Sequence, residues 1–334
     1  MKVTESSTYR LMQTNLDRIS SRLQDLQNQG ASGLKLSKGS DDPGAIRPVL
    51  TTRTQMSRTD RYIETMGTSL DKMDTAESYM NSMEDILQRA KELTLNAINS
   101  SLNDADLQTV ADEVAELKGQ LLDAGNAIID GKYIFSGYQE NVKPFTENPA
   151  YDPSLYDQSD STTWPYLYHG DSNPTTLEIT PGEYVEVNVT GNQLFMGVSN
   201  GNWLGSTTAA LGQPEAKSID IFSVLTRTEE AIRAGNFDDP GGAGGGMQAQ
   251  VDNLETAADQ NRRIRSKMGV RGSRIESAME QQETVKVDLE QILSRYQDAD
   301  AIETFNGIVQ QETALKAALN VTSRISSISI LDYF

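Results

Sequence analysis

The chain has 334 residues, a formal net charge of −19, no cysteine and a single histidine. A surface this acidic makes nucleic acid an unexpected partner, and the lack of cysteine excludes disulfides and Cys-ligated metal sites. No segment reaches the roughly 20 apolar residues of a membrane span, so we expect no membrane insertion. Hydrophobic residues make up 37% and aromatic residues 6%, which favours helical layers over one large globular core.

The acidic charge is concentrated in the middle of the chain. Residues 136–215 contain ten Asp and Glu but one Lys, whereas residues 1–36 contain five Lys and Arg and three acids. Because like charges on a solvated face repel one another, we expect the middle segment to form an outer surface. Residues 1–25 lack the apolar region of a secretory signal peptide. If the protein is exported, we expect a route that does not cleave its N-terminus.

The first predicted helix covers residues 8–29 and carries apolar side chains at spacings of 4, 3, 4 and 3. This heptad pattern is typical of a helix that packs against another helix. Its apolar positions are Met12, Leu16, Ile19, Leu23 and Leu26. The Ser, Asp, Pro and Gly residues at 37–44 predict a turn and then a new helix, with Asp41 or Asp42 as its N-cap and Pro43 at its first position.

Two further helices are predicted, at about residues 43–99 and 104–130, from apolar positions that repeat at close to 3.5 residues. Those of the first are Ile63, Met66, Leu70, Met73, Met80, Met83 and Leu87, and those of the second are Leu107, Val110, Val114, Leu117, Leu121 and Ile128. Methionine adapts to irregular surfaces, but a methionine row at helical spacing is more typical of a core than of a binding groove.

The pattern changes to β-structure from residue 132 onward, where aromatic residues accumulate. Apolar and polar residues alternate at 176–179 and 184–189, with Pro181-Gly182 as a turn between them. We therefore predict a small β-rich insertion over residues 132–215.

Helical periodicity returns at about residues 219–234 and, after a glycine-rich break, from Met247 to Ser329. We predict a single helix over this last range, with final apolar positions Ile302, Phe305, Val309, Leu315, Leu319, Ile325 and Ile328. A helix this long must run alongside the N-terminal helices, which brings the two chain ends together. Because only the N-terminal side contains a turn, near residue 40, we expect a break on that side alone.

These elements predict a mainly α fold with a small β domain (α+β), in which both chain ends form an elongated helical bundle or coiled coil. The expected domains are terminal assembly helices at 1–40 and 300–334, a helical bundle at 41–131 and 216–299, and the insertion at 132–215.

Several segments, in their order along the chain, resemble the flagellin-like family of bacterial flagellar proteins, and in particular its hook-associated members. These segments are Ser37–Pro43, Gly131–Tyr138, Lys143–Phe145, Tyr168–Asp171, Met268–Glu276 and Ser323–Phe334. Two features differ from filament flagellin. Asp41-Asp42-Pro43 replaces the usual Asp-Asp-Ala type turn, and Ile330–Phe334 replaces the usual Val-Leu-Ser-Leu-Leu type tail.

The resemblance implies a structural protein of the flagellum that joins the hook to the filament. The implied partners are a neighbouring hook-associated protein, flagellin, an export chaperone and further copies in a ring of about eleven. Type III export to the extracellular flagellum is implied as well, with terminal segments that become ordered on assembly. The expected assembly interface comprises Met12, Leu16, Ile19, Leu23, Leu26, Leu315, Leu319, Ile325, Ile328 and Leu331.

Other interpretations stay open. Heptads alone are more typical of an intramolecular bundle, and only their place at both chain ends, with the resemblance, favours assembly. A filament-forming flagellin is the alternative within the family. Outside it, the alternatives are a glycan-binding module on a helical stalk and, more weakly, a wall-degrading enzyme.

No motif indicates an enzyme. His169, without cysteine or a second histidine, cannot form a usual zinc site. No segment has the spacing of an EF-hand loop, and the glycines at 241–246 lack the Lys and Ser or Thr of a P-loop. We therefore predict no catalytic, cofactor-binding or metal-binding residue.

Overall fold

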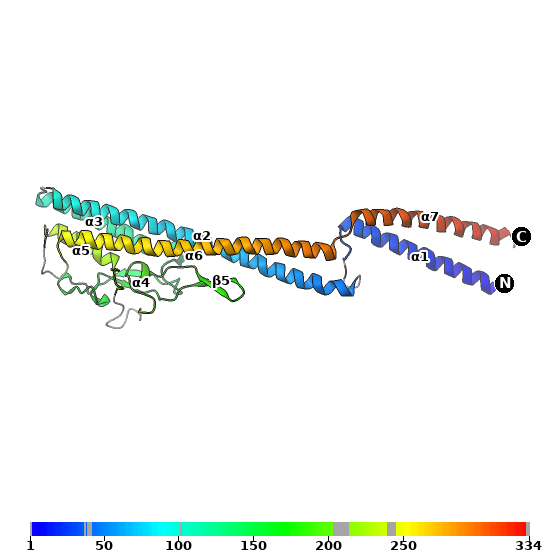
Figure 1. Cartoon of the computed structure of the whole chain (residues 1–334), viewed down its shortest axis with the longest axis horizontal. Helices are drawn as coiled ribbons and strands as arrows, with labels where there is room; N and C mark the ends of the chain where they lie inside the picture. The colour runs from blue at the N-terminus through cyan, green and yellow to red at the C-terminus, as the bar shows by residue number, and fades with distance from the viewer. Residues whose placement is uncertain are drawn as a thin grey trace. The chain divides into compact units, whose positions relative to one another are not determined.

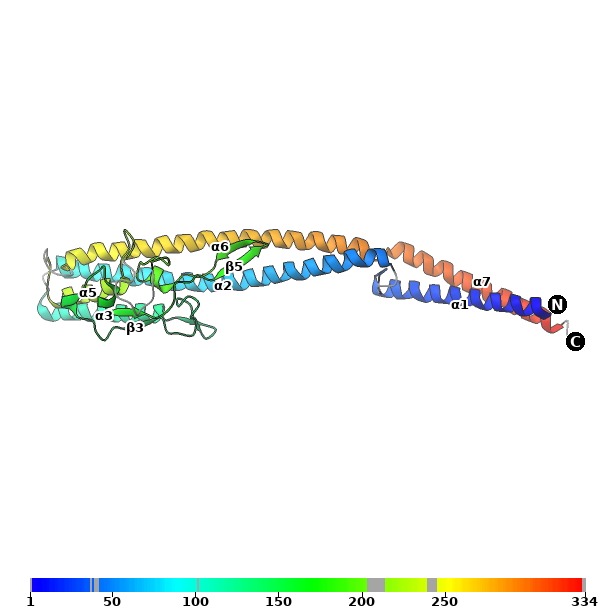
Figure 2. The ribbon, with the colours of Figure 1, turned by 90° about the horizontal axis from the view of Figure 1, so that it is seen from below.

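The structure is a computed structural model, shown from two sides in Figures 1 and 2. It describes residues 2–36, 38, 42–100, 102–202, 214–238 and 245–331, without the side chains of 2–6, 8 and 325–331. The chain divides into two units. We call residues 1–61 and 282–334 the terminal unit and residues 62–281 the central unit.

Most of the described residues are helical, which confirms the mainly α fold class (Figure 1). The terminal unit contains α1 (Lys2–Ser32) and α7 (Ala301–Leu331), the central unit contains α3 (Asp104–Gly125), α4 (Gly191–Leu194) and α5 (Ile221–Arg233), and α2 (Pro43–Asn99) and α6 (Met247–Gln297) contribute to both. Within the described ranges, no helix combines the length and the hydropathy that a membrane span requires.

The start of α2 follows the prediction from its cap residues. The Asp42 carboxylate accepts hydrogen bonds from the backbone N–H of Gly44 at 2.9 Å and of Ala45 at 3.2 Å. Pro43 occupies the first helical position, where a backbone N–H would have no partner within the helix. α2 therefore begins where the sequence predicts.

The strands form three separate antiparallel pairs within the described residues. β1 (Ile128–Ile129) pairs with β2 (Lys132–Tyr133), β3 (Phe145–Glu147) with β4 (Tyr166–Tyr168), and β5 (Thr176–Thr180) with β6 (Glu183–Glu186). Two short 3-10 helices lie between β3 and β4, η1 (Pro153–Leu155) and η2 (Ser161–Thr163). The turn predicted at Pro181-Gly182 is confirmed, with Gly182 at a φ of +83°.

Two helix ends differ from the prediction. The third helix ends at Gly125 rather than near residue 130, because Asn126 turns away and exchanges hydrogen bonds with the backbone of Phe145 at 2.9 and 3.1 Å. The predicted single C-terminal helix is wrong, since it is two helices, α6 and α7, separated at residues 298–300. Asp300 caps α7, where its carboxylate accepts from the N–H of Ile302 at 2.8 Å.

The main hydrophobic cluster lies in the central unit among the described residues, and the terminal unit adds the buried apolar side chains Leu36, Val49 and Leu289. As predicted, the methionine row of α2 is buried, and α3 contributes Leu107, Val114 and Leu121. α3 packs on α5, and a cluster of aromatic rings fills the space beside them. Ring centroids lie 4.8 Å apart for Phe145 and Phe195 and 4.9 Å apart for Phe145 and Phe222. Such tilted pairs add attraction beyond their buried area.

Gly125 allows this cluster to approach α3. A Cβ at position 125 would lie 3.0 Å from Phe145 Cδ2 and 3.3 Å from ring atoms of both Phe195 and Phe222. We expect Gly125→Ala to destabilise the central unit by about 1–3 kcal/mol through overpacking. Gly119→Ala is the matched control, because Gly119 is exposed on the same helix with open space around it, and it should stabilise by up to about 1 kcal/mol. Urea unfolding followed by tryptophan fluorescence measures both, and equal effects would contradict this account.

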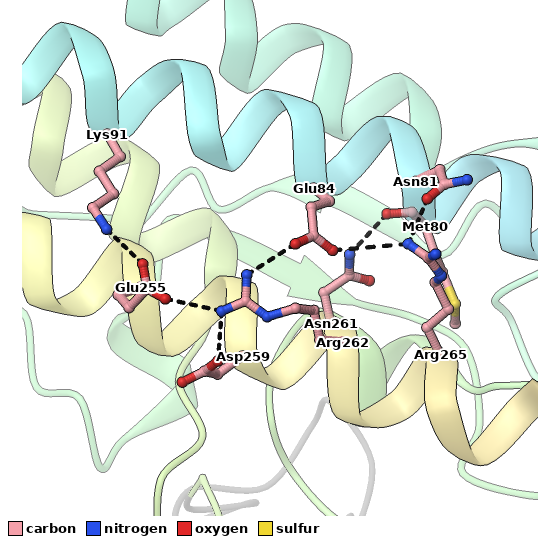
Figure 3. A network of polar contacts seen from close by, with 9 residues as sticks. All are labelled: Met80, Asn81, Glu84, Lys91, Glu255, Asp259, Asn261, Arg262 and Arg265. Carbon is pink, nitrogen blue, oxygen red and sulfur yellow. Dashed lines mark hydrogen bonds and ion pairs between the residues drawn. The ribbon is translucent and has the colours of Figure 1, made fainter.

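A cationic segment of α6 joins this helix to α2 (Figure 3). Arg262 contacts Glu84 at 2.9 Å, Glu255 at 2.9 Å and Asp259 at 2.5 Å, and Lys91 of α2 reaches Glu255 at 2.5 Å. These groups are partly exposed, so each pair contributes little by itself and the network acts mainly by holding geometry.

Beside this network, Asn261 is buried and donates from Nδ2 to the Met80 carbonyl at 2.7 Å. A buried amide in a helix–helix interface selects one register, since sliding the helices would leave the amide without a partner. Arg271 and Arg274, further along α6, pair with Glu186 and Glu183 of β6. α6 therefore holds both α2 and the β5–β6 hairpin.

Asp220 caps the start of α5 and is buried. Its Oδ2 accepts from the Ser223 N–H at 2.8 Å and from the Ser223 hydroxyl, while Oδ1 has no partner among the described residues. Burial raises the pKa of this carboxyl from its ordinary 3.8 to about 7. At pH values between 3.8 and about 7, the Asp220 carboxyl is protonated in the folded state and ionised in the unfolded state. The stability contributed by Asp220 is therefore full below pH 3.8 and is lost as the pH rises through 7.

We expect Asp220→Asn to remove this dependence, because asparagine keeps the cap without the ionisation. The variant should gain stability relative to the wild type as the pH rises from 4 to 8. Asp152→Asn is the control: hydrogen bonds from Ser154 lower the pKa of exposed Asp152, so its contribution is lost as the pH falls. Urea unfolding across this pH range should give a rising relative stability for Asp220→Asn and almost no trend for Asp152→Asn, whose ionisation changes only below this range. The same trend in both variants would refute the assignment.

Candidate assembly surface

The helices at the two chain ends lie side by side in both views (Figures 1 and 2). The heptad residues of α1 face this contact and are half-buried, namely Met12, Leu16, Ile19, Leu23 and Leu26. On α7 the half-buried positions are Gly307, Ile308, Gln311, Ala314, Leu315, Ala318 and Thr322, and Thr304 is buried. The structure therefore brings the α1 residues of the predicted interface together with Leu315.

The first half of the apolar face predicted for α7 does not pack on α1 in the single chain. Ile302 is 76% exposed, and Phe305 and Val309 are each 61% exposed. At 100° per residue these three lie on the side of α7 opposite Gly307, Gln311 and Ala318, which are half-buried toward α1. Spacing alone selected the larger apolar residues, whereas the contact with α1 uses smaller and more polar ones.

Of the remaining predicted interface residues, Leu319 alone has a described side chain. Leu319 is 52% exposed in the single chain. The side chains of Ile325, Ile328 and Leu331 lie outside the described residues. The role of these four residues in assembly stays a prediction.

Two helix glycines mark where α1 and α7 approach most closely. A Cβ at Gly307 would lie 3.2 Å from Leu26 Cδ1, and one at Gly30 would lie 3.4 Å from Ile308 Cδ1. Small residues allow helix axes to come close with few bulky side chains between them. Apart from Thr304, the described side chains between α1 and α7 are only half-buried, so the pair has no apolar core of its own within one chain.

Both helices of the pair are interrupted at the same level, where the sequence predicted a break on one side only. Leu34 and Asp298 form an antiparallel β-bridge. Its two hydrogen bonds run from Lys35 N–H to the Gln297 carbonyl and from Ala299 N–H to the Gly33 carbonyl, each at 2.8 Å. Gly33 ends α1 at a φ of +73°, a conformation that glycine adopts readily. We call this bridge and its flanking residues the clasp.

Side chains fasten the clasp to the adjoining helices. Gln297 is buried, and its Oε1 accepts from Arg53 of α2 at 3.0 Å. Lys35 Nζ donates to the Arg295 carbonyl at 3.0 Å. Sequence reasoning missed the clasp, although Asp298-Ala299-Asp300 is an N-cap signal that interrupts the apolar periodicity.

Proline substitutions two residues apart test the clasp. Ala299→Pro removes the N–H that donates to Gly33, so we expect amide hydrogen exchange at Lys35 to accelerate by roughly tenfold or more. Ala301→Pro places proline at the first position of α7, where it is well accommodated, and should leave that exchange rate unchanged. Exchange measured by NMR or mass spectrometry compares them, and equal rates in both variants would argue against the bridge.

The two units differ in net charge. The terminal unit has 14 Lys and Arg against 14 Asp and Glu, and the central unit has 15 against 34. The whole net charge of −19 therefore belongs to the central unit. The terminal unit also carries 11 of the 19 large hydrophobic side chains that are exposed in the described residues. A neutral surface with exposed apolar groups is suited to contact with other protein.

The described residues contain no group of three or more His, Asp and Glu placed to hold a metal ion. His169 shares a 2.7 Å hydrogen bond with the Thr146 hydroxyl, between β3 and the residue after β4. This contact accounts for His169 as a structural residue of the hairpin.

Comparisons with known proteins match both ends of the chain. Residues 4–140 match the bacterial flagellin N-terminal helical region, and residues 251–334 match the bacterial flagellin C-terminal helical region. Flagellar hook-associated protein 3 of Escherichia coli is 21% identical over 97% of this chain and 98% of that protein.

Two further comparisons are with a flagellin and with a solved structure. Polar flagellin F of Vibrio parahaemolyticus is 28% identical, but over only 29% of this chain and 27% of that protein. The crystal structure of Xanthomonas campestris FlgL matches 72% of this chain and 97% of its own, with a TM-score of 0.52 and 16% identity, which supports the fold. The similarity to hook-associated protein 3 therefore extends over nearly the whole chain, and that to flagellin does not.

Proposed function

This chain belongs to the flagellin family of bacterial flagellar proteins, as a relative of flagellar hook-associated protein 3, and we propose that it joins the flagellar hook to the filament through its terminal unit. The family is one of structural proteins, so the role is mechanical rather than catalytic. The observation that carries the proposal is the contrast between the units. One is a charged body with a core, and the other is neutral and exposes apolar side chains.

Coupled folding and binding is the proposed mechanism. Residues 1–40 and 300–334 form the assembly segments, because most side chains between α1 and α7 are only half-buried within one chain. Ordering each residue costs about 1–2 kcal/mol of conformational entropy, and burial of apolar surface gives back about 25 cal/mol per Å². A pair of helices that buries little alone gains stability when neighbours cover it.

The partners follow from the same proposal. They are a neighbouring hook-associated protein on one side, flagellin on the other and further copies of this chain in a ring of about eleven. An export chaperone would cover the assembly segments inside the cell, and type III export would deliver the chain to the extracellular flagellum without cleavage. Full-length relatedness to hook-associated protein 3 supports this set over a filament made of this chain alone.

Deleting the gene tests the function directly. Hooks should still form, while flagellin should leave the cell unassembled and accumulate in the medium. Cells that build normal filaments without the gene would refute the junction role. Purified protein that polymerises alone into long filaments would favour flagellin instead.

Single substitutions in the assembly segments test the mechanism. Leu23→Asp places a charge in the half-buried α1–α7 contact, and Leu319→Asp places one on α7. Each should abolish incorporation into flagella while the central unit stays folded, as judged by its near-UV circular dichroism. Gln24→Asp is the control, because it adds the same charge at an exposed position of α1. Normal filaments built with Leu23→Asp protein would count against coupled folding.

A further inference from the structure

The face of α7 that points away from α1 has no partner within the described residues of the chain. It consists of Ile302, Phe305 and Val309, which follow one another at three and four residues and so share one side of the helix. Three large apolar side chains exposed over two turns are costly in water. We call this set the Phe305 face.

The charged groups next to the Phe305 face on α7 are carboxylates. From Tyr296 to Leu315 the chain contains no Lys or Arg. Glu312 lies on the same side of α7 as Phe305, and Asp298 and Asp300 precede the helix. Glu303 lies on the other side, where it lines a hollow with Arg18 and Arg22 of α1. A surface that covers an apolar patch with an acidic rim should itself be apolar with a basic rim. The carboxylates beside the Phe305 face therefore indicate that the surface which covers it is apolar and basic.

The start of α2 has this complementary composition. Residues 43–61 contain four arginines and one acid, Asp60, which already pairs with Lys286 at 2.8 Å. Leu50 is 56% exposed there. Arg47 and Arg58 lie on the same side of α2 as Leu50, are exposed, and form no ion pair within the described part of the chain.

Resting on the function proposed above, we propose that the Phe305 face docks onto the Leu50 region of α2 in a second copy of this chain. The two surfaces differ, so each copy offers one to each neighbour, and contacts of this kind close into a ring. The central units, which carry the whole net charge, repel one another and keep the contact confined to the terminal units.

Incorporation of variants with a positive or a negative charge at residue 305 tests whether a basic surface covers the Phe305 face. Phe305→Lys would face Arg47 and Arg58 of the neighbour and should lower incorporation into flagella by roughly tenfold or more. Phe305→Glu would meet cations there and should lower incorporation much less. Gln310→Lys and Gln310→Glu, at an exposed α7 position off this face, are the controls and should both incorporate normally.

Three outcomes would overturn the inference. They are incorporation of Phe305→Lys at the wild-type level, a larger loss with Phe305→Glu than with Phe305→Lys, and equal losses with the Gln310 controls. None of these would affect the junction role, which the gene deletion tests separately through release of flagellin. The two proposals can therefore fail independently.

Disulfide formation between copies gives a second measurement, since the chain has no native cysteine. A Phe305→Cys chain and a Leu50→Cys chain, each with its own epitope tag, are expressed together in cells that lack the native gene. After mild oxidation of isolated flagella, a dimer that contains both tags is expected. The control pairs Phe305→Cys with Leu11→Cys, because Leu11 is as exposed but lies on α1. No mixed dimer, or one only with Leu11→Cys, would refute the assigned surface.

Discussion

Packing of the aromatic cluster against α3 and α5 is the interaction on which the central unit depends. It closes around Gly125, where three phenylalanine rings approach the helix backbone, and it needs no second copy to be complete. The terminal unit has no equivalent among its described residues, since most side chains between α1 and α7 are only half-buried. Stability is therefore graded along the chain, and the segments with the least burial are those assigned to assembly.

The distribution of charge reinforces this division. A body that carries the whole net charge resists association with its own copies, whereas a neutral unit does not. Within the central unit the cations are concentrated on α6, where they hold α2 and β6 in place (Figure 3). In the described part of the terminal unit, Lys286 pairs with Asp60, whereas Arg47 and Arg58 are exposed and form no ion pair. These two arginines therefore remain available for contacts with another chain.

Sequence reasoning succeeded where a physical pattern was long and local. The methionine row repeats at helical spacing along α2, and the Asp42 cap lies at the start of the same helix. Both were predicted. It failed at α7, because it ranked residues by hydrophobicity while the contact with α1 uses Gly307 and Thr304. The clasp was missed since it joins residues far apart in the chain, and only the fold shows that Leu34 and Asp298 meet.

The helices are interrupted at the clasp in both chain segments that pass through it, and we expect this level to act as a joint. At the clasp the chain passes twice, once in each direction, and the two passages are linked by the bridge between Leu34 and Asp298. Tension along either passage is shared with the other, because the covalent chain and the hydrogen bonds act in parallel. Bending is easier there than within a helix, since no helical hydrogen bonds must be broken. We therefore expect a link that resists stretching yet follows curvature, as a coupling between two parts of a rotating shaft requires.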